Sequence, residues 1–221
     1  MGKTAILLGA TGLTGSILLQ KLIADKNYTT IKLFSRNSVA ITSEKIQEFI
    51  IDVLQLEQSA KDFTADEVFC CIGTTAAKTK DKKLYKAIDY GIPVIAAKLA
   101  KQNKILTFIV MSSIGADAKS TVFYSKTKGE MERDVLLQNI KNTSILQPSL
   151  IGGNRDEHRL GERIGKGVMR ILNPLMIGEL KKYKMIHPDK IASCMHILAN
   201  ANYKKTIFTS DEIQEIANTK K

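Results

Sequence analysis

Short apolar runs alternate along the chain with longer stretches in which apolar residues recur every three or four positions. The short runs predict buried strands, and the longer periodic stretches predict amphipathic helices. The predicted strands span residues 3–9, 30–35, 46–51, 67–72, 104–111, 143–147 and 206–210. The predicted helices span residues 13–25, 84–101, 121–139, 155–172 and 190–200, and a short helix follows the last strand.

The repeated order of strand, helix and strand predicts the fold class. It indicates an α/β protein with a doubly wound parallel sheet, a Rossmann fold, in which helices cover both faces. Pro93 falls inside the long helix 84–101 and marks either a kink or a new helix start. Because 221 residues is a common size for one α/β domain, we expect a single domain over residues 1–221.

The composition is that of an ordinary globular protein, with 44% hydrophobic and 25% charged residues. The net charge of +11 favours anionic partners such as nucleotides, acidic metabolites, nucleic acid or an anionic membrane surface. The densest lysine stretch, residues 78–86, is typical of a solvated face. Nucleic acid is a weaker candidate, because the chain has no Trp and few other aromatic residues for base stacking.

The cysteine pattern and the N-terminus bear on the cellular compartment. The three cysteines, Cys70, Cys71 and Cys194, do not form a disulfide framework and are interpreted as small buried hydrophobic residues. We find neither a signal peptide nor an apolar run of about 18 residues, so we expect no membrane span. These features together predict a cytoplasmic protein with reduced thiols.

A glycine-rich loop lies between the first predicted strand and the first predicted helix. Gly9 permits a tight turn, Gly12 lets the backbone approach a pyrophosphate, and Gly15 lets the helix pack closely on the strand. The free N–H groups and partial positive charge of the helix N-terminus then favour phosphates. The loop therefore predicts a dinucleotide site, and its other expected contacts are Thr11, Leu13 and Thr14.

The end of the second strand predicts which nicotinamide cofactor is preferred. NAD-binding proteins place an acidic residue there to hold the ribose 2′-hydroxyl, and this chain has Ser35 and Arg36 instead. The planar guanidinium of Arg36 suits a 2′-phosphate, and Ser35 offers a further hydrogen bond. We therefore expect NADP(H) to be preferred over NAD(H).

A candidate catalytic set follows the fifth strand, which ends in Ser112 and Ser113. Tyr124 and Lys128 stand four residues apart on one face of the next helix. A tyrosine normally has a pKa of about 10, and a nearby ammonium group favours its ionised form. Such a tyrosine acts as a general acid or base in reactions that move a hydride to or from a carbonyl carbon.

These motifs resemble those of one known superfamily. The G-x-x-G-x-x-G loop and the Ser…Tyr-x-x-x-Lys set are similar to those of extended and atypical short-chain dehydrogenases/reductases. The chain most resembles the atypical members, namely reductases like the Tat-interacting NADPH-binding tumour-suppressor proteins and short bacterial NAD(P)H-binding proteins. By this resemblance Tyr124 is the acid/base, Lys128 tunes it and binds the nicotinamide ribose, and Ser113 orients the carbonyl, with Ser112 as the alternative.

The same resemblance implies further cofactor contacts after the other strands. The pair Asp52 and Val53 is expected near the adenine, and a proline after the sixth strand is expected near the nicotinamide carboxamide. The residues implied in this way are Asp52, Val53, Cys71, Ile72, Gly73 and Pro148. Gln147 stands where relatives often have arginine, which puts an anchoring role for that position in doubt.

The leading hypothesis is an NADP(H)-dependent oxidoreductase that acts on a small carbonyl or alcohol substrate. Residues 1–150 are then the cofactor-binding core, and residues 151–221 form a substrate-facing cap with the last strand. The alternative is a regulatory or interaction protein that binds NADP(H) without robust turnover. The three histidines are too scattered for a metal site, and the sequence leaves both a monomer and a homodimer open.

Overall fold

A computed structural model of the chain describes residues 2–152, 178–201 and 203–219. Its strands form one seven-stranded sheet, and every neighbouring pair is parallel. The strand order is β3-β2-β1-β4-β5-β6-β7, which confirms the predicted doubly wound Rossmann fold. The strands are β1 (Lys3–Leu8), β2 (Tyr28–Ser35), β3 (Ile46–Ile50), β4 (Glu67–Cys70), β5 (Thr107–Met111), β6 (Asn142–Gln147) and β7 (Ile207–Thr209).

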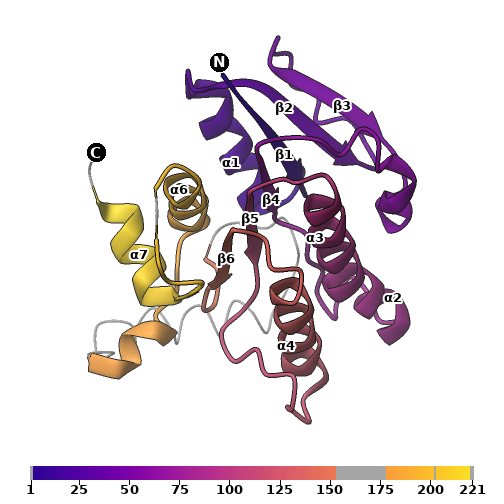
Figure 1. Ribbon diagram of the computed structural model, residues 1–221. Coiled ribbons are helices and arrows are strands. Elements are labelled where there is room, and N and C mark those ends of the chain that lie inside the picture. The colour runs from indigo at the N-terminus through magenta and orange to yellow at the C-terminus, as the bar shows by residue number, and fades with distance from the viewer. Residues whose placement is uncertain (1, 153–177, 202, 220–221) are drawn as a thin grey trace.

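Helices cover both faces of this sheet, as Figure 1 shows. On one face lie α1 (Leu13–Ala24), α6 (Pro188–Ala199) and α7 (Ser210–Asn218). On the other lie α3 (Ile92–Gln102) and α4 (Phe123–Leu136). Side chains of β1 alternate between the two cores, which is why its run of apolar residues is unbroken.

The long helix predicted around Pro93 is present, but it contains a π turn. The segment begins with α2 (Lys82–Lys86), continues through the π turn η2 (Ala87–Gly91) and ends with α3. In the π turn the N–H of Ile92 bonds the carbonyl of Ala87, five residues earlier. Pro93 therefore lies in the first turn of α3, directly after the π turn.

Several element boundaries differ from the predicted ones. The strand predicted at 104–111 begins only at Thr107, because Lys104 has a positive φ of 58° and belongs to a turn. Two 3₁₀ helices, η1 (Val53–Ser59) and η4 (Gly178–Tyr183), were not predicted. The predicted helix 155–172 lies outside the described residues. Within the described residues, no helix is long and apolar enough to cross a membrane.

The three cysteines occupy the cores, as predicted. Cys70 and Cys194 are fully buried, and all three thiols are free of disulfides. The thiol of Cys71 lies 3.6 Å from the sulfur of Met195, which joins the end of β4 to α6. Burial raises the pKa of the Cys70 thiol to about 11, so this thiol stays protonated.

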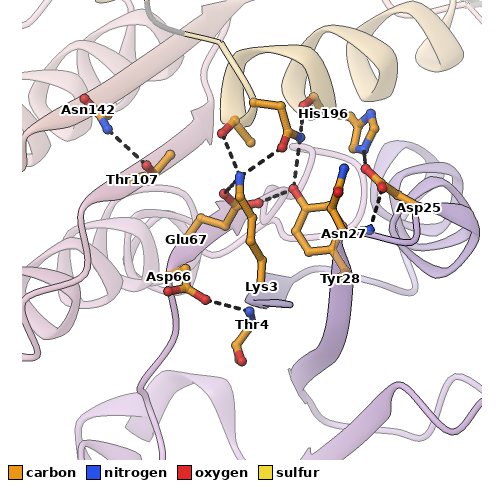
Figure 2. Close-up of polar contacts among 12 residues, drawn as sticks. Lys3, Thr4, Asp25, Asn27, Tyr28, Asp66, Glu67, Thr107, Asn142 and His196 are labelled. Atoms are coloured by element: carbon orange, nitrogen blue, oxygen red, sulfur yellow. Dashed lines mark hydrogen bonds and ion pairs between the residues drawn. The ribbon is translucent and has the colours of Figure 1, made fainter. Parts of the chain in front are cut away.

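A polar cluster lies at the amino end of the sheet, as Figure 2 shows. The ammonium of Lys3 lies 3.2 Å from Glu67 and donates to Asn200 at 2.9 Å. The phenol of Tyr28 donates to the same carboxylate of Glu67, and the Asn200 amide donates back to that phenol at 3.2 Å. The cluster therefore ties β1, β2 and β4 to the end of α6.

Candidate functional site

The glycine loop has the geometry that its sequence predicts. Gly9 has a φ of +85°, and a Cβ there would lie 2.8 Å from the carbonyl oxygen of Cys71. A Cβ on Gly15 would lie only 2.1 Å from the carbonyl oxygen of Gly9, so α1 packs directly on the turn. Gly12 is the N-cap of α1 and supplies no side chain to the first N–H groups of the helix. These N–H groups stay free for a ligand.

A cavity of about 890 Å³ opens in front of this loop. It is formed where the segments after β1, β4, β5 and β6 meet at the carboxyl end of the sheet, the usual ligand position in this fold. Ten of the predicted site residues line it: Thr11, Gly12, Leu13, Thr14, Cys71, Gly73, Ser113, Tyr124, Lys128 and Pro148. The other predicted residues do not line it: Gly9, Gly15, Ser35, Arg36, Asp52, Val53 and Ile72.

At the end of β2, Ser35 is turned into the protein and Arg36 is exposed to solvent. Ser35 is buried, and its hydroxyl donates to the carbonyl oxygen of Asn37 at 2.7 Å. This bond shapes the turn after β2. Arg36 is exposed in that turn, and within the described residues its guanidinium makes no hydrogen bond or ion pair. Its charge is therefore available to an anion.

Asp52 and Val53, which follow β3, stabilise the local structure. Asp52 is the N-cap of η1, and its carboxylate accepts the N–H of Leu54 at 3.1 Å. Val53 is buried against the core that lies under α3 and α4. Helix capping thus already uses one carboxylate oxygen of Asp52, the residue for which the family resemblance implies an adenine contact.

The two serines after β5, Ser112 and Ser113, differ in their hydrogen bonding. The hydroxyl of Ser112 donates to the carboxylate of Glu132. The hydroxyl of Ser113 is buried at the cavity and, within the described part of the chain, is the buried side-chain polar atom that lacks a hydrogen-bond partner. A buried hydroxyl without a partner is costly, and a ligand in the cavity would relieve this cost.

Tyr124 and Lys128 lie on the first two turns of α4 and line the cavity. Tyr124 is 42% exposed, so its phenol is open to a ligand and to solvent. Lys128 is 4% exposed. An ammonium group this deeply buried needs a partner, and Tyr124 does not supply one.

Asp89 is the partner of Lys128. Its carboxylate lies 2.8 Å from the ammonium of Lys128 and accepts the N–H of Thr74 at 2.7 Å. Asp89 is 1% exposed and stands in the π turn η2, a feature that is frequent at functional sites. A Cβ on Gly73 would contact both charged groups, at 3.5 Å and 3.9 Å. The glycine therefore leaves room beside a buried ion pair that faces the cavity.

Glu132 continues the same face of α4 one turn further. Its carboxylate accepts both Ser112 and the amide of Gln147, the latter at 3.0 Å to each oxygen. Burial raises the pKa of this carboxyl above its usual range, although these hydrogen bonds and the charge of Lys128 oppose the shift. Gln147, which stands where relatives often have arginine, is thus engaged inside the protein.

Asp89 and Glu132 were not among the predicted site residues. The sequence nevertheless contained a signal for both, because each is an acidic residue on the buried face of a predicted helix. Asp89 is three residues before the buried Ile92. Glu132 follows Tyr124 and Lys128 at the same spacing of four residues. Acidic residues are rarely buried unless they are paired, so this placement predicts partners.

Residues 9–150 match the model of a family described as NAD(P)H-binding. The chain belongs to this NAD(P)H-binding family. The matched segment begins at Gly9 and ends just after Pro148, so it includes every predicted site residue. NAD(P)H binding is therefore supported by the family as well as by the loop geometry.

Relatives of this NAD(P)H-binding protein agree with the predicted atypical branch of the short-chain dehydrogenase/reductase superfamily. It is 34% identical over 183 residues to "Protein FMP52-1, mitochondrial" of Scheffersomyces stipitis, covering 80% of this chain and 76% of the relative. It is 29% identical over 168 residues to "Protein HTATIP2" of Rattus norvegicus, covering 74% and 69%. The fungal relative is named mitochondrial, whereas the sequence predicted the cytoplasm.

Solved structures share the fold at low identity. A UDP-glucose 4-epimerase of Thermotoga maritima has a TM-score of 0.68 at 14% identity, covering 97% of this chain and 81% of that one. An ADP-L-glycero-D-manno-heptose-6-epimerase of Helicobacter pylori has a TM-score of 0.69 at 14% identity, covering 97% and 80%. At this identity the likeness supports the Rossmann architecture alone.

Proposed function

We propose that the protein is an NADP(H)-dependent oxidoreductase that interconverts a small carbonyl compound and its alcohol. The observation that carries the proposal is the buried hydroxyl of Ser113, which has no partner among the described residues and lines the same cavity as Tyr124 and Lys128. A carbonyl oxygen is the acceptor that this hydroxyl lacks. The same oxygen would need a proton donor, which the phenol of Tyr124 supplies.

The residues at the cavity fit the cofactor of the family. The free N–H groups at the start of α1 suit the pyrophosphate, and Gly12 leaves the approach open. Lys128 and Pro148 line the same cavity as Ser113, and by the family resemblance they suit the nicotinamide half. When bound, the cofactor would supply or accept the hydride.

Each polar group then has one task at the substrate oxygen. Ser113 donates a hydrogen bond that orients the carbonyl, and Tyr124 transfers a proton to or from that oxygen. The ammonium of Lys128 favours negative charge on the Tyr124 oxygen during proton transfer, and Asp89 holds that ammonium in place. Asp89 thus acts as a positioning residue for Lys128.

The preference for NADP(H) rests on Arg36. The guanidinium stands after β2 without a partner among the described residues, and there is no carboxylate at Ser35, Arg36 or Asn37 to hold a ribose 2′-hydroxyl. A 2′-phosphate would give Arg36 a two-pronged, charge-assisted contact. The protein's location in the cytoplasm stays a prediction, and fractionation with a mitochondrial marker tests it against the location in the relatives' names.

The proposed function is tested by NADPH-dependent turnover of a panel of aldehydes and ketones. We expect Tyr124→Phe to lower kcat by about 10²–10⁴-fold, the usual contribution of a positioned acid or base. Tyr203→Phe is the matched control, since Tyr203 is 41% exposed and does not line the cavity. It should retain full turnover.

Binding of NADPH separates the two functional hypotheses. Tyr124→Phe should bind NADPH as the unaltered protein does, because the lost hydroxyl acts on the substrate. If the unaltered protein binds NADPH and reduces no carbonyl compound, the oxidoreductase proposal fails. The alternative, a protein that binds NADP(H) as a regulatory ligand, then replaces it.

A further inference from the structure

A second pocket, of about 400 Å³, adjoins the cofactor cavity. It lies between the loop after β4 and the start of α4, and we call it the side pocket. Its lining consists of Thr74, Thr75, Ala76, Thr79, Lys80, Lys82, Tyr85, Phe123 and Tyr124. Thr74, Thr75 and Tyr124 also line the cofactor cavity, so the two spaces share Tyr124, the residue to which the proposed function assigns proton transfer.

The walls of the side pocket are aromatic. Tyr85 is buried, and its ring meets that of Phe123 edge to face, with centroids 5.6 Å apart. Tyr124 completes this wall toward the cofactor cavity. Flat aromatic walls of this kind favour a ring or a branched aliphatic group. The volume is within the range of small-molecule sites.

The rim of the side pocket is positively charged. Lys80 and Lys82 are both exposed, and the nine lining residues include no carboxylate. The ammonium of Lys82 lies 5.6 Å from the centroid of the Phe123 ring, so charge stands directly beside the aromatic wall. An anionic group at the outer end of a ligand would meet both lysines.

We propose that the side pocket binds the part of the substrate remote from its carbonyl group. The substrate class is an aromatic or branched aliphatic carbonyl compound that carries a carboxylate or similar anion at its far end. This inference rests on the proposed function, because it places the reacting carbonyl at Tyr124. It goes further by assigning the specificity to Ala76, Lys80, Lys82, Tyr85 and Phe123.

The charge at the rim is tested with a matched pair of substrates, 4-formylbenzoate and 4-methylbenzaldehyde. We expect kcat/KM to be higher for the anionic aldehyde by about tenfold, as two partly screened charges allow. The double variant with Lys80→Glu and Lys82→Glu should abolish or reverse this preference. Lys83→Glu is the control, because Lys83 is also exposed, follows Lys82 directly on α2 and does not line the pocket. Equal use of both aldehydes by the unaltered protein would overturn the inference.

The pocket itself is tested by filling it. Ala76→Phe adds a ring at an exposed lining position and should raise KM for both aromatic aldehydes while leaving propanal unaffected. The affinity for NADPH should not change. An equal effect on propanal would place the block in the cofactor cavity and contradict the proposal.

Binding without turnover distinguishes failure of this inference from failure of the proposed function. The probe is 4-carbamoylbenzoate, which has no reducible carbonyl, titrated into the NADP-loaded protein by calorimetry. Tight binding that Lys80→Glu and Lys82→Glu weaken supports the side pocket even if no aldehyde is reduced. Turnover of aldehydes together with no binding of the probe would leave the oxidoreductase proposal standing and overturn the side pocket.

Discussion

The two ends of the sheet each hold a lysine beside a buried carboxylate, and their surroundings differ. At the amino end, Lys3 and Glu67 bond to protein partners that tie β4 to the end of α6 (Figure 2), although the Lys3 side chain is 35% exposed and lines an open surface pocket. At the carboxyl end, Lys128 and Asp89 face a cavity of about 890 Å³. There the hydroxyl of Ser113 has no partner within the described residues.

This difference separates polar groups that serve stability from those that serve a ligand. Among the described residues, the buried side-chain polar atoms at the amino end all have hydrogen-bond partners within the protein. A buried hydroxyl that faces a cavity keeps a free hydrogen bond at a cost in stability, as functional sites often do. Mutations at the amino end should therefore change mainly the stability of the fold, whereas mutations at the carboxyl end should also change turnover or the affinity for the cofactor.

The largest effect is expected at the carboxyl end, from Asp89→Asn. Lys128 would keep its buried charge without a carboxylate, and breaking such a pair costs about 3–5 kcal/mol of stability. We also expect kcat to fall by more than KM for NADPH rises. The reason is that Asp89 positions the ammonium of Lys128, which by the proposed function acts on Tyr124. Chemical denaturation measures the loss of stability, and steady-state kinetics measure kcat and KM. An unchanged kcat in the folded variant would reduce Asp89 to a purely structural role.

At the amino end, Glu67→Ala should reduce stability without affecting the site. It removes the acceptor of both Tyr28 and Lys3. Because Lys3 is 35% exposed and can turn to water, we expect a loss of about 2–3 kcal/mol, less than for a fully buried pair. Urea unfolding measures this loss. The affinity for NADPH should be unchanged at a temperature where the variant is folded. A weaker affinity would show that the amino end also contributes to cofactor binding.

A smaller effect is expected from Arg36→Ala. Loss of one charge-assisted contact to a 2′-phosphate should weaken NADPH binding by about 10- to 100-fold and leave NADH binding unchanged. Arg133→Ala is a matched control, since Arg133 is an exposed arginine that pairs with Asp134 on α4. Equal weakening of both nucleotides by Arg36→Ala would contradict the predicted preference for NADP(H).

The smallest effect is a pH dependence of stability at the amino end. Burial raises the pKa of the Glu67 carboxyl, although hydrogen bonds from Tyr28 and Lys3 oppose the shift. A raised pKa means that the folded protein binds this proton more tightly than the unfolded chain does. The stabilisation is therefore present below the unfolded pKa and is lost as pH rises through the folded one.

The comparison of the unaltered protein with Glu67→Gln isolates that dependence. The amide of this variant cannot ionise, so the stability of the unaltered protein relative to the variant should fall as pH rises above about 4.3, the ordinary pKa of a glutamate. Urea unfolding at several pH values gives the difference, in which other titrating groups cancel. A difference that stays constant or grows with pH would show that the carboxylate is stabilised by its partners.

The sequence predicted the fold well because its signals were local. The unbroken apolar run of β1 and the glycine loop after it are sufficient to place the first strand, turn and helix. The positions of Ser113, Tyr124 and Lys128 followed from one strand end and one helix spacing. The π turn before Pro93 was not predicted, because a proline in a helical pattern is compatible with a kink, a restart or a π turn.

The hydrogen-bond and ion-pair partners of the site residues could not be predicted from the sequence pattern. Asp89 and Lys128 are far apart in the sequence, and only the packing of η2 against α4 brings their charged groups to 2.8 Å. The engagement of Ser112 by Glu132 likewise depends on how α4 crosses the end of β5. Such pairings are set by tertiary contacts, so helix periodicity identifies the buried acids without identifying their partners.

By our proposal, the carboxyl end of the sheet binds NADPH, whereas the polar cluster at the amino end stabilises the fold. This division is tested by calorimetric titration of NADPH into the unaltered protein, Gly12→Val and Glu67→Gln. We predict micromolar or tighter binding by the unaltered protein and by Glu67→Gln, and none by Gly12→Val, whose side chain would enter the cavity before α1. Absence of binding by the folded, unaltered protein, or equal binding by Gly12→Val, would contradict the account.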